Sequence, residues 1–233
     1  MNPFLFLAAA PTAPASIPTL TRREGVRQLI ESPPVTRHDG WNLVTLDQAR
    51  LVAGERLTLA NGTRKHLDLY ADGTFIAFGA FSNFLGWRGD GAGFAVRPKI
   101  NSLALAEYVY DFVGVYDAIL AFVEPRPPTL RFALGIRHAH FDEDKRLYLL
   151  PGPINGLAYT AADEDDRAYA PATTFEHGFD ADVAAESELG RGSIALDLVR
   201  PLYNWFGLTD DQVPYTNAER TEIDGAAIEN PRG

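Results

Sequence analysis

Two histidines and a carboxylate between positions 138 and 142 have the types and the spacing that metal chemistry requires. His138, His140 and Asp142 recur at every second residue. On an extended strand, residues at that spacing project from one face. Imidazole nitrogens and a carboxylate oxygen gathered in this way are ligands for zinc and similar divalent ions. The spacing is therefore compatible with a metal-dependent hydrolase built around these three residues.

The same segment has a second interpretation, which we favour. It borders a predicted hairpin turn at 142–145, and such turns usually lie in solvent. The spacing supplies only three ligands, and any further ligand would have to come from elsewhere in the chain. We therefore expect an exposed turn and no cofactor, and we keep a divalent metal at His138, His140 and Asp142 as the alternative.

The other motifs that could support chemistry are incomplete. A calcium-binding loop beginning at Asp163 would require glycine and glutamate where Ala168 and Thr174 stand. The glycine-rich run Gly86–Gly93 lacks the ending of a phosphate-binding loop, and no Gly-x-Ser-x-Gly nucleophile motif occurs. The chain has no cysteine, which excludes disulfides, thiolate nucleophiles and iron–sulfur clusters. The sequence therefore favours a non-catalytic function.

Aromatic residues outside the predicted helices and strands are the main candidates for an interaction surface. Phe84, Trp87 and Tyr215 fall in or beside predicted loops, and Phe4 and Phe6 lie in an apolar N-terminal segment. Aromatic residues are enriched at protein–protein interfaces. Loops also cover cores, and large aromatic side chains often fill the space beneath them. Both interpretations stay open, and we predict these five as interaction residues.

The N-terminal segment is apolar and uncharged over residues 1–20. Its run Phe4–Ala10 has no basic segment before it, and Arg22 and Arg23 follow it, which argues against a secretion signal. The run is also too short to span a bilayer. We expect a cytoplasmic protein in which 1–20 is an extended arm docked on another chain and 217–233 is a loose polar tail.

Composition and charge limit the classes of partner. The chain has 233 residues, of which 46% are hydrophobic, enough for one domain, which we place at 21–216. Its formal net charge of −10 repels the phosphate backbone of nucleic acids. We expect no direct nucleic-acid contact and no membrane contact. The expected partner is another protein chain, in a homo-oligomer or a larger complex.

Hydrophobic periodicity predicts an α+β fold. The stretch Arg56–Phe81 contains three alternating segments separated by the tight-turn dipeptides Asn-Gly and Asp-Gly, which predict an antiparallel meander. Further strands are predicted at Thr129–Ile136 and Arg146–Leu150, and the acidic stretch 151–190 is expected to be mostly loop. A second helix, capped by Ser193, is expected to run to Phe206 near the C-terminus.

The first predicted helix, from Ser102 to about Val123, is the most apolar part of the chain. Only one narrow stripe along it is polar, at Glu107, Asp111, Gly114 and Asp117. A helix that is apolar on most of its circumference is buried on most of its circumference. We therefore expect the meander sheet to pack against this long buried helix.

Three short segments resemble the downstream region of some bacterial proteins. They are Gly40-Trp41-Asn42-Leu43, the hairpin from Leu67 to Phe75, and Tyr203-Asn204-Trp205-Phe206-Gly207-Leu208 with Val213-Pro214-Tyr215. Those proteins carry a Schlafen/AlbA-like putative DNA-binding or ATP-binding domain near their N-terminus, which is not visible in this sequence. The resemblance implies an accessory or sensing domain of a bacterial system linked to nucleic-acid or defence functions. Together with the incomplete catalytic motifs, the apolar N-terminal segment and the loop aromatics, it leads us to expect a non-catalytic binding or assembly domain of a bacterial accessory or defence-type system, working through protein–protein contacts.

Overall fold

The computed structural model describes residues 3–13, 20–37, 43, 50–53, 56–61, 65–80, 99–142, 145–150, 168–183 and 189–230. Within these ranges the strands are β1 (Phe4–Pro11), β2 (Arg50–Ala53), β3 (Arg56–Asn61), β4 (Lys65–Tyr70), β5 (Phe75–Ala80), β6 (Lys99–Asn101), β7 (Thr129–Arg137), β8 (His140–Asp142), β9 (Lys145–Arg146), β10 (Tyr148–Leu150), β11 (Ala168–Tyr169) and β12 (Phe175–Asp182). The helices are η1 (Leu20–Arg22), α1 (Glu24–Glu31), α2 (Ser102–Leu120), α3 (Arg191–Trp205), η5 (Asp210–Gln212) and α4 (Gly225–Glu229).

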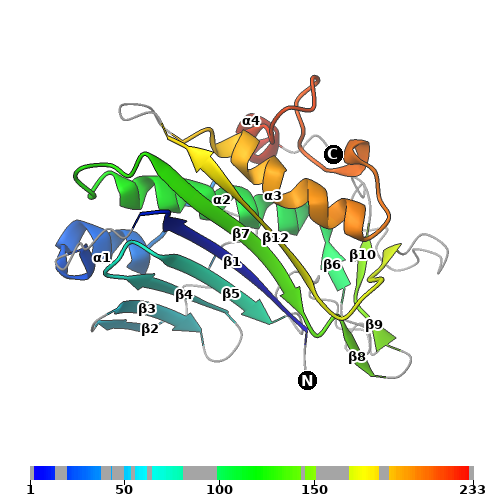
Figure 1. The fold of residues 1–233 in the computed structure, drawn as a ribbon, viewed down its shortest axis with the longest axis horizontal. Helices are drawn as coiled ribbons and strands as arrows, with labels where there is room; N and C mark the ends of the chain where they lie inside the picture. The colour runs from blue at the N-terminus through cyan, green and yellow to red at the C-terminus, as the bar shows by residue number, and fades with distance from the viewer. Residues whose placement is uncertain are drawn as a thin grey trace.

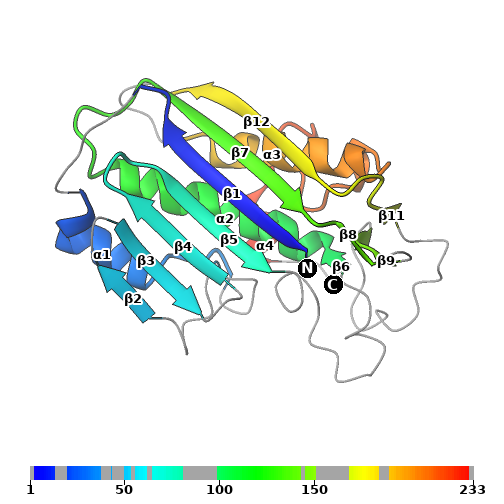
Figure 2. The same cartoon turned by 60° about the horizontal axis from the view of Figure 1, so that its bottom comes forward.

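An antiparallel sheet with the strand order β12-β7-β1-β5-β4-β3-β2 forms one layer of the molecule. Figures 1 and 2 show α2 and α3 side by side behind this sheet. A small mixed sheet, β11-β10-β6, lies at the start of α2, and β8 and β9 form a separate hairpin. The predicted α+β fold is therefore confirmed.

The predicted meander is confirmed as β3, β4 and β5. Its second turn has the expected geometry, because Gly73 adopts a φ of +86° and its N–H donates to Tyr70 O at 3.1 Å. A left-handed φ of this kind favours glycine. The Asp72 carboxylate accepts the N–H of Thr74 at 2.9 Å and completes the turn. Gly62, in the first predicted turn, lies outside the described residues.

The long helix α2 is buried against the sheet, as predicted. Asn101 caps it, because its side-chain oxygen accepts the N–H groups of Leu103 at 3.0 Å and Ala104 at 3.4 Å. The Phe75 ring from β5 stacks on Phe112 of α2 with ring centroids 5.1 Å apart. Aromatic pairs of this kind stabilise a core beyond the burial of their area.

The prediction of an arm docked on another chain at 1–20 is wrong for Phe4–Pro11. This segment is β1, which pairs with β5 on one side and β7 on the other. Three of its own side chains, Leu5, Leu7 and Ala9, are fully buried. The segment reads as one apolar run because alternate residues face α2 and a second apolar surface. A strand with apolar surroundings on both faces shows no polar alternation.

Residues 217–230 are also part of the fold, so the expectation of a loose tail at 217–233 is wrong for them. Ile223 and Ile228 are buried, and the N–H of Ile223 donates to Gly192 O at 3.1 Å. Asp224 caps α4 by accepting the N–H of Ala226 at 2.9 Å. A few buried apolar side chains suffice to fix a segment that is mostly polar.

Two further details differ from the sequence-based expectation. The stretch 151–190 contains β12, whose alternate residues contact α3 through rings such as Phe175, 5.3 Å from Trp205. Helix α3 begins at Arg191 with Gly190 as its N-cap, while the Ser193 hydroxyl donates to Gly190 O at 2.8 Å inside the first turn.

Within the described ranges, no helix is long and apolar enough to cross a membrane.

The position of β1 can be tested by a core truncation. Replacing Leu7 by Ala is expected to lower the free energy of unfolding by about 2–5 kcal/mol, because a fully buried leucine leaves a cavity. Urea unfolding of the two proteins measures the difference. A loss well under about 1 kcal/mol would contradict the placement of β1 in the core and favour a peripheral arm.

Candidate functional site

The polar stripe of α2 holds two carboxylates that are almost fully buried. Glu107 is 2% exposed and Asp111 is 3% exposed. They stand four residues apart and thus on one face of the helix. A buried charge is costly unless it is paired and hydrogen-bonded. Their surroundings therefore decide whether they are reactive groups or structural ones.

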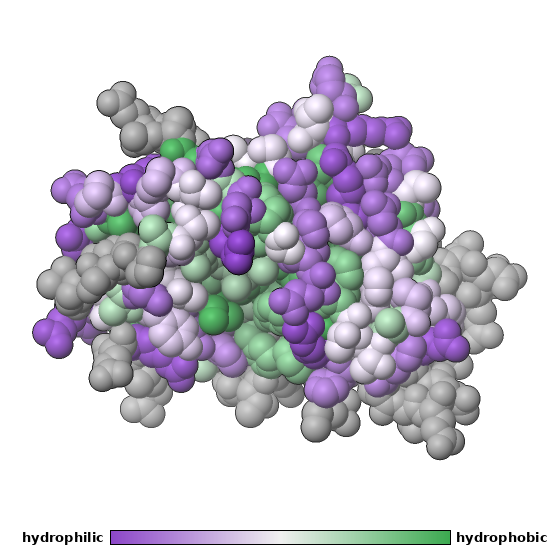
Figure 3. All heavy atoms as spheres, in the orientation of Figure 1, coloured by the Kyte–Doolittle hydropathy of each residue, from purple (hydrophilic) through white to green (hydrophobic). Residues whose placement is uncertain are grey.

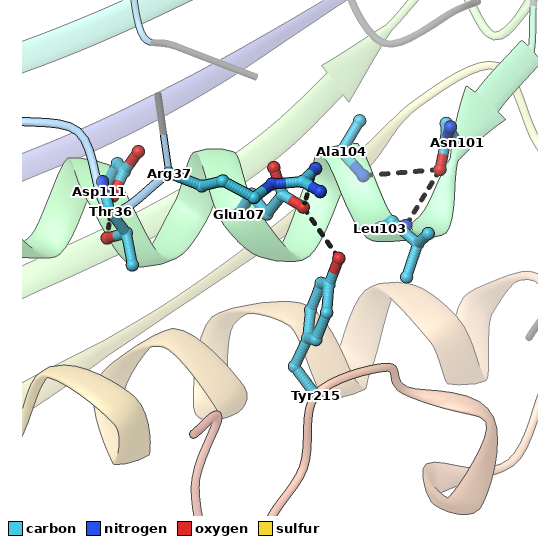
Figure 4. Close-up of polar contacts among 8 residues, drawn as sticks. All are labelled: Thr36, Arg37, Asn101, Leu103, Ala104, Glu107, Asp111 and Tyr215. Atoms are coloured by element: carbon cyan, nitrogen blue, oxygen red, sulfur yellow. Dashed lines mark hydrogen bonds and ion pairs between the residues drawn. The ribbon is translucent and has the colours of Figure 1, made fainter. Parts of the chain in front are cut away.

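Glu107 receives two strong donors from remote parts of the chain. Its Oε1 accepts a hydrogen bond from Arg37 Nη2 at 2.7 Å and another from the Tyr215 hydroxyl at 2.7 Å. Figure 4 shows both side chains pointing at the carboxylate, Tyr215 from the C-terminal segment and Arg37 from the segment after α1. Hydrogen bonds to an ionised group are stronger than neutral ones, so this contact joins three segments firmly.

Asp111 is held in a similar way. Its Oδ1 accepts the Thr36 N–H at 3.1 Å, the Thr36 hydroxyl at 2.5 Å and Arg191 Nη2 at 2.7 Å. The Arg191 guanidinium lies 3.8 Å from the centre of the Tyr110 ring. It also fills the space where a Cβ at Gly114 would stand, which explains why the polar stripe includes a glycine.

The pKa of the Asp111 carboxyl lies above its ordinary value. Burial is the largest cause, and Glu107 adds to it, whereas Thr36 and Arg191 act in the opposite direction. Burial likewise lowers the pKa of the Arg191 guanidinium, while Asp111 raises it. Each carboxylate thus has an arginine and at least one hydroxyl as partners. This arrangement suits a structural lock between α2 and its neighbours better than a reactive pair.

The residues of the predicted metal site do not lie on one extended strand. His138 has a φ of +58° between β7 and β8, so the spacing argument from a continuous strand does not apply. The His140 Nε2 lies 2.9 Å from Ala170 O, and the His138 ring packs edge-on against Phe4 at 5.7 Å. The side chain of Asp142 lies outside the described residues. Among the described residues, no group of three or more potential ligands could hold a metal ion, and the site stays a prediction.

The sheet has a second face, opposite α2 and α3, which we call the outer face. Along its centre lies the apolar strip, defined here as Phe4, Phe6, Ala8, Ile76, Phe78 and Ala133, all half-buried. These residues come from three neighbouring strands, β1, β5 and β7. Figure 3 shows hydrophobic surface across the middle of this face, with hydrophilic residues around it.

Aromatic rings make up much of the apolar strip and its surroundings. Phe78 stacks on His66 of β4 with centroids 4.7 Å apart, and the Phe4 ring lies 4.9 Å from Phe78 on the other side. The Phe6 ring covers Gly135, where a Cβ would collide with it. The Arg137 guanidinium carbon lies 5.1 Å from the centre of the Phe6 ring. The rings therefore form a continuous layer and not isolated side chains.

Ion pairs flank the strip on both sides, and we call them the rim pairs. Toward β12, Arg131 binds Asp180 through two nitrogens at 2.7 and 3.1 Å, and Arg137 pairs with Glu176. Toward β3, Arg56 lies 3.8 Å from Asp68, whose other oxygen accepts the Thr58 hydroxyl at 2.5 Å. The Arg131 contact holds the pKa of Asp180 below its ordinary value. Both rims thus contain acids and bases in contact.

The five predicted interaction residues fall into three groups. Phe4 and Phe6 lie together in the apolar strip, and Phe84 and Trp87 lie outside the described residues. Tyr215 is half-buried on the opposite side of the sheet, where it donates to Glu107. Sequence reasoning missed Ile76 and Phe78 as surface candidates, because their alternation with Phe75 and Ala77 showed a strand but not that its second face is apolar.

Comparison with known proteins adds no family to these observations. No protein-family model matches the chain, and no curated protein or solved structure gives a significant match. The resemblance to the downstream region of Schlafen/AlbA-like proteins therefore stays a prediction. The function has to be argued from the chain's own surface.

The lock at Glu107 can be measured with a double-mutant cycle. Replacing Tyr215 by Phe is expected to destabilise the protein by about 1.5–3 kcal/mol, because it removes a hydrogen bond to a buried charged group. Replacing Glu107 by Ala should cost about 3–5 kcal/mol. In the Glu107→Ala background the tyrosine change should cost much less, as chemical unfolding of the four proteins will show. Additive losses would mean that the two residues act independently.

The raised pKa of Asp111 predicts a pH dependence of known sign. The folded state holds this proton more tightly than the unfolded state, whose aspartate pKa is about 3.9. Its stabilising contribution is therefore fully present below that value and is lost as the pH rises through the folded pKa. Relative to Asp111→Asn, the free energy of unfolding of the natural protein should fall over this window and then level off. A relative rise would show that Arg191 outweighs burial.

Proposed function

We propose that this chain is a non-catalytic binding or assembly domain, and that its contact surface is the apolar strip on the outer face of the sheet. The observation that carries the proposal is the layer of half-buried rings at Phe4, Phe6 and Phe78 between two rims of ion pairs. An apolar centre within a polar rim is the usual arrangement of a protein–protein interface. Contiguous apolar patches rimmed by polar residues mark interaction sites on soluble proteins.

The chemistry of the other candidate supports the same conclusion. Glu107 and Asp111 are each held by an arginine and by hydroxyl groups, and both are almost fully buried. A general acid or base has to reach the proton that it transfers. The carboxylates of α2 are therefore better suited to holding the fold together. From the sequence resemblance, we further propose that the partner belongs to a bacterial accessory or defence-type system.

The proposal is tested with two matched substitutions. Phe78→Asp places a charge in the apolar strip, while Tyr169→Asp places the same charge at an exposed tyrosine of the small sheet. We expect Phe78→Asp to raise the dissociation constant of the complex with a protein partner, another copy included, at least about tenfold. Tyr169→Asp should leave this constant unchanged. Melting temperatures check that both variants fold. Full retention of binding by folded Phe78→Asp would show that the strip is not the contact surface.

A further inference from the structure

We propose that the partner seated on the apolar strip is a second copy of this chain, docked face to face about a twofold axis. The inference rests on the proposed function, that the strip is a protein contact surface, and adds which protein occupies it. Three observations lead to it: the overall charge, the composition of the rims, and the relief of the strip.

The charge of the chain restricts where two copies can meet. At −10, two copies repel each other over most of their surface. On the outer face, the rim pairs Arg131–Asp180, Arg137–Glu176 and Arg56–Asp68 place equal numbers of bases and acids beside the strip. These pairs add no net charge to the face. At the end of β12, the Asp182 carboxylate accepts the Thr129 hydroxyl at 3.1 Å and adds one acid to this face. Apart from Asp182, the charged groups of the rim pairs would meet the partner as neutral pairs.

A twofold interface also requires a surface that is complementary to itself. An axis along β1 would bring the Arg131–Asp180 side of one copy over the Arg56–Asp68 side of its partner. An axis across the strands would oppose the Arg131–Asp180 and Arg137–Glu176 ends of the same rim. In either arrangement an acid can face a base, because every rim contains both signs. A strongly basic or acidic partner would find no surplus of opposite charge among these pairs.

The relief of the strip suits the packing of one sheet on another. The large rings of Phe4, Phe6 and Phe78 lie together at one end of the strip, and the small residues Ala8 and Ala133 are paired at the other end. A twofold axis across the strands would therefore place the rings of one copy over the alanines of the other. Sheets that pack face to face lie about 10 Å apart and interdigitate side chains across the gap. The rings of one copy would fill the space above the small residues Ala8 and Ala133 of the other copy. This is how the two layers of a β-sandwich form a common core.

The absence of cysteine from the chain allows a direct footprint of the face. Ala8→Cys introduces a single thiol within the strip, between Ala133 and Ile76, and Ala226→Cys introduces a control thiol at an exposed position of α4. We expect alkylation of Cys at position 8 to slow several-fold as the concentration of the chain itself rises, while the control rate stays constant. Light scattering on the same samples should show the mass doubling over the same concentration range.

Reversal of one rim charge tests the electrostatic part of the argument. Arg131→Asp places two acids side by side and should raise the dimer dissociation constant about tenfold or more. Adding Asp180→Arg restores the balance and should restore most of the affinity. The double variant also controls for folding, because it keeps the cross-strand ion pair with reversed polarity.

The outcomes separate this inference from the proposed function. A monomeric mass at every concentration, with an unchanged alkylation rate at position 8, overturns the second copy as the occupant. If another protein then slows that alkylation, the strip is still a contact surface and the proposed function stands. If the protein dimerises but position 8 stays reactive in the dimer, the dimer uses another face and the inference is wrong.

Discussion

The burial of α2 on nearly all sides is the constraint on which the rest of the structure depends. A helix with apolar residues around most of its circumference must be enclosed, and one sheet can cover only one side of it. The segment around Thr36, helix α3 and the C-terminal segment contact its polar stripe. Because that stripe includes Glu107 and Asp111, these segments must bring cations and hydroxyl groups with them. The segments that enclose the helix are thus the same segments that compensate its buried charges.

The sheet that covers α2 is apolar on both faces at its centre, and this shapes the protein's surface. The inner face is filled by residues such as Leu5 and Phe75, which are fully buried. The outer face carries the apolar strip between the rim pairs. A sheet that only served as a support for helices would have polar residues on its second face. We therefore propose that the apolar outer face serves association, whereas the enclosed carboxylates hold the elements of the fold together.

Local patterns in the sequence predicted the meander and the helix α2, because turns and periodicity depend on neighbouring residues. The partners of the α2 carboxylates were not predictable, since Arg37 and Tyr215 stand 70 and 108 positions from Glu107. The strand β12 has a period of two in Phe175, His177 and Phe179, but Glu176 and Gly178 stand between them and the acidic sequence that precedes the strand is typical of a loop. The role of β1 was missed because a run that is apolar on both faces gives no periodic signal.

The central place of β1 has a consequence for the order in which the protein can form. The two neighbours of β1 are β5 and β7, and β7 ends at Arg137. Since translation proceeds from the N-terminus, β1 is made before both of its neighbours and can be paired on both sides only after Arg137 has been synthesised. Contacts so distant in sequence form slowly, and unpaired apolar strands associate readily with other chains. Until β7 is made, Phe4–Pro11 is therefore an apolar strand without its second neighbour.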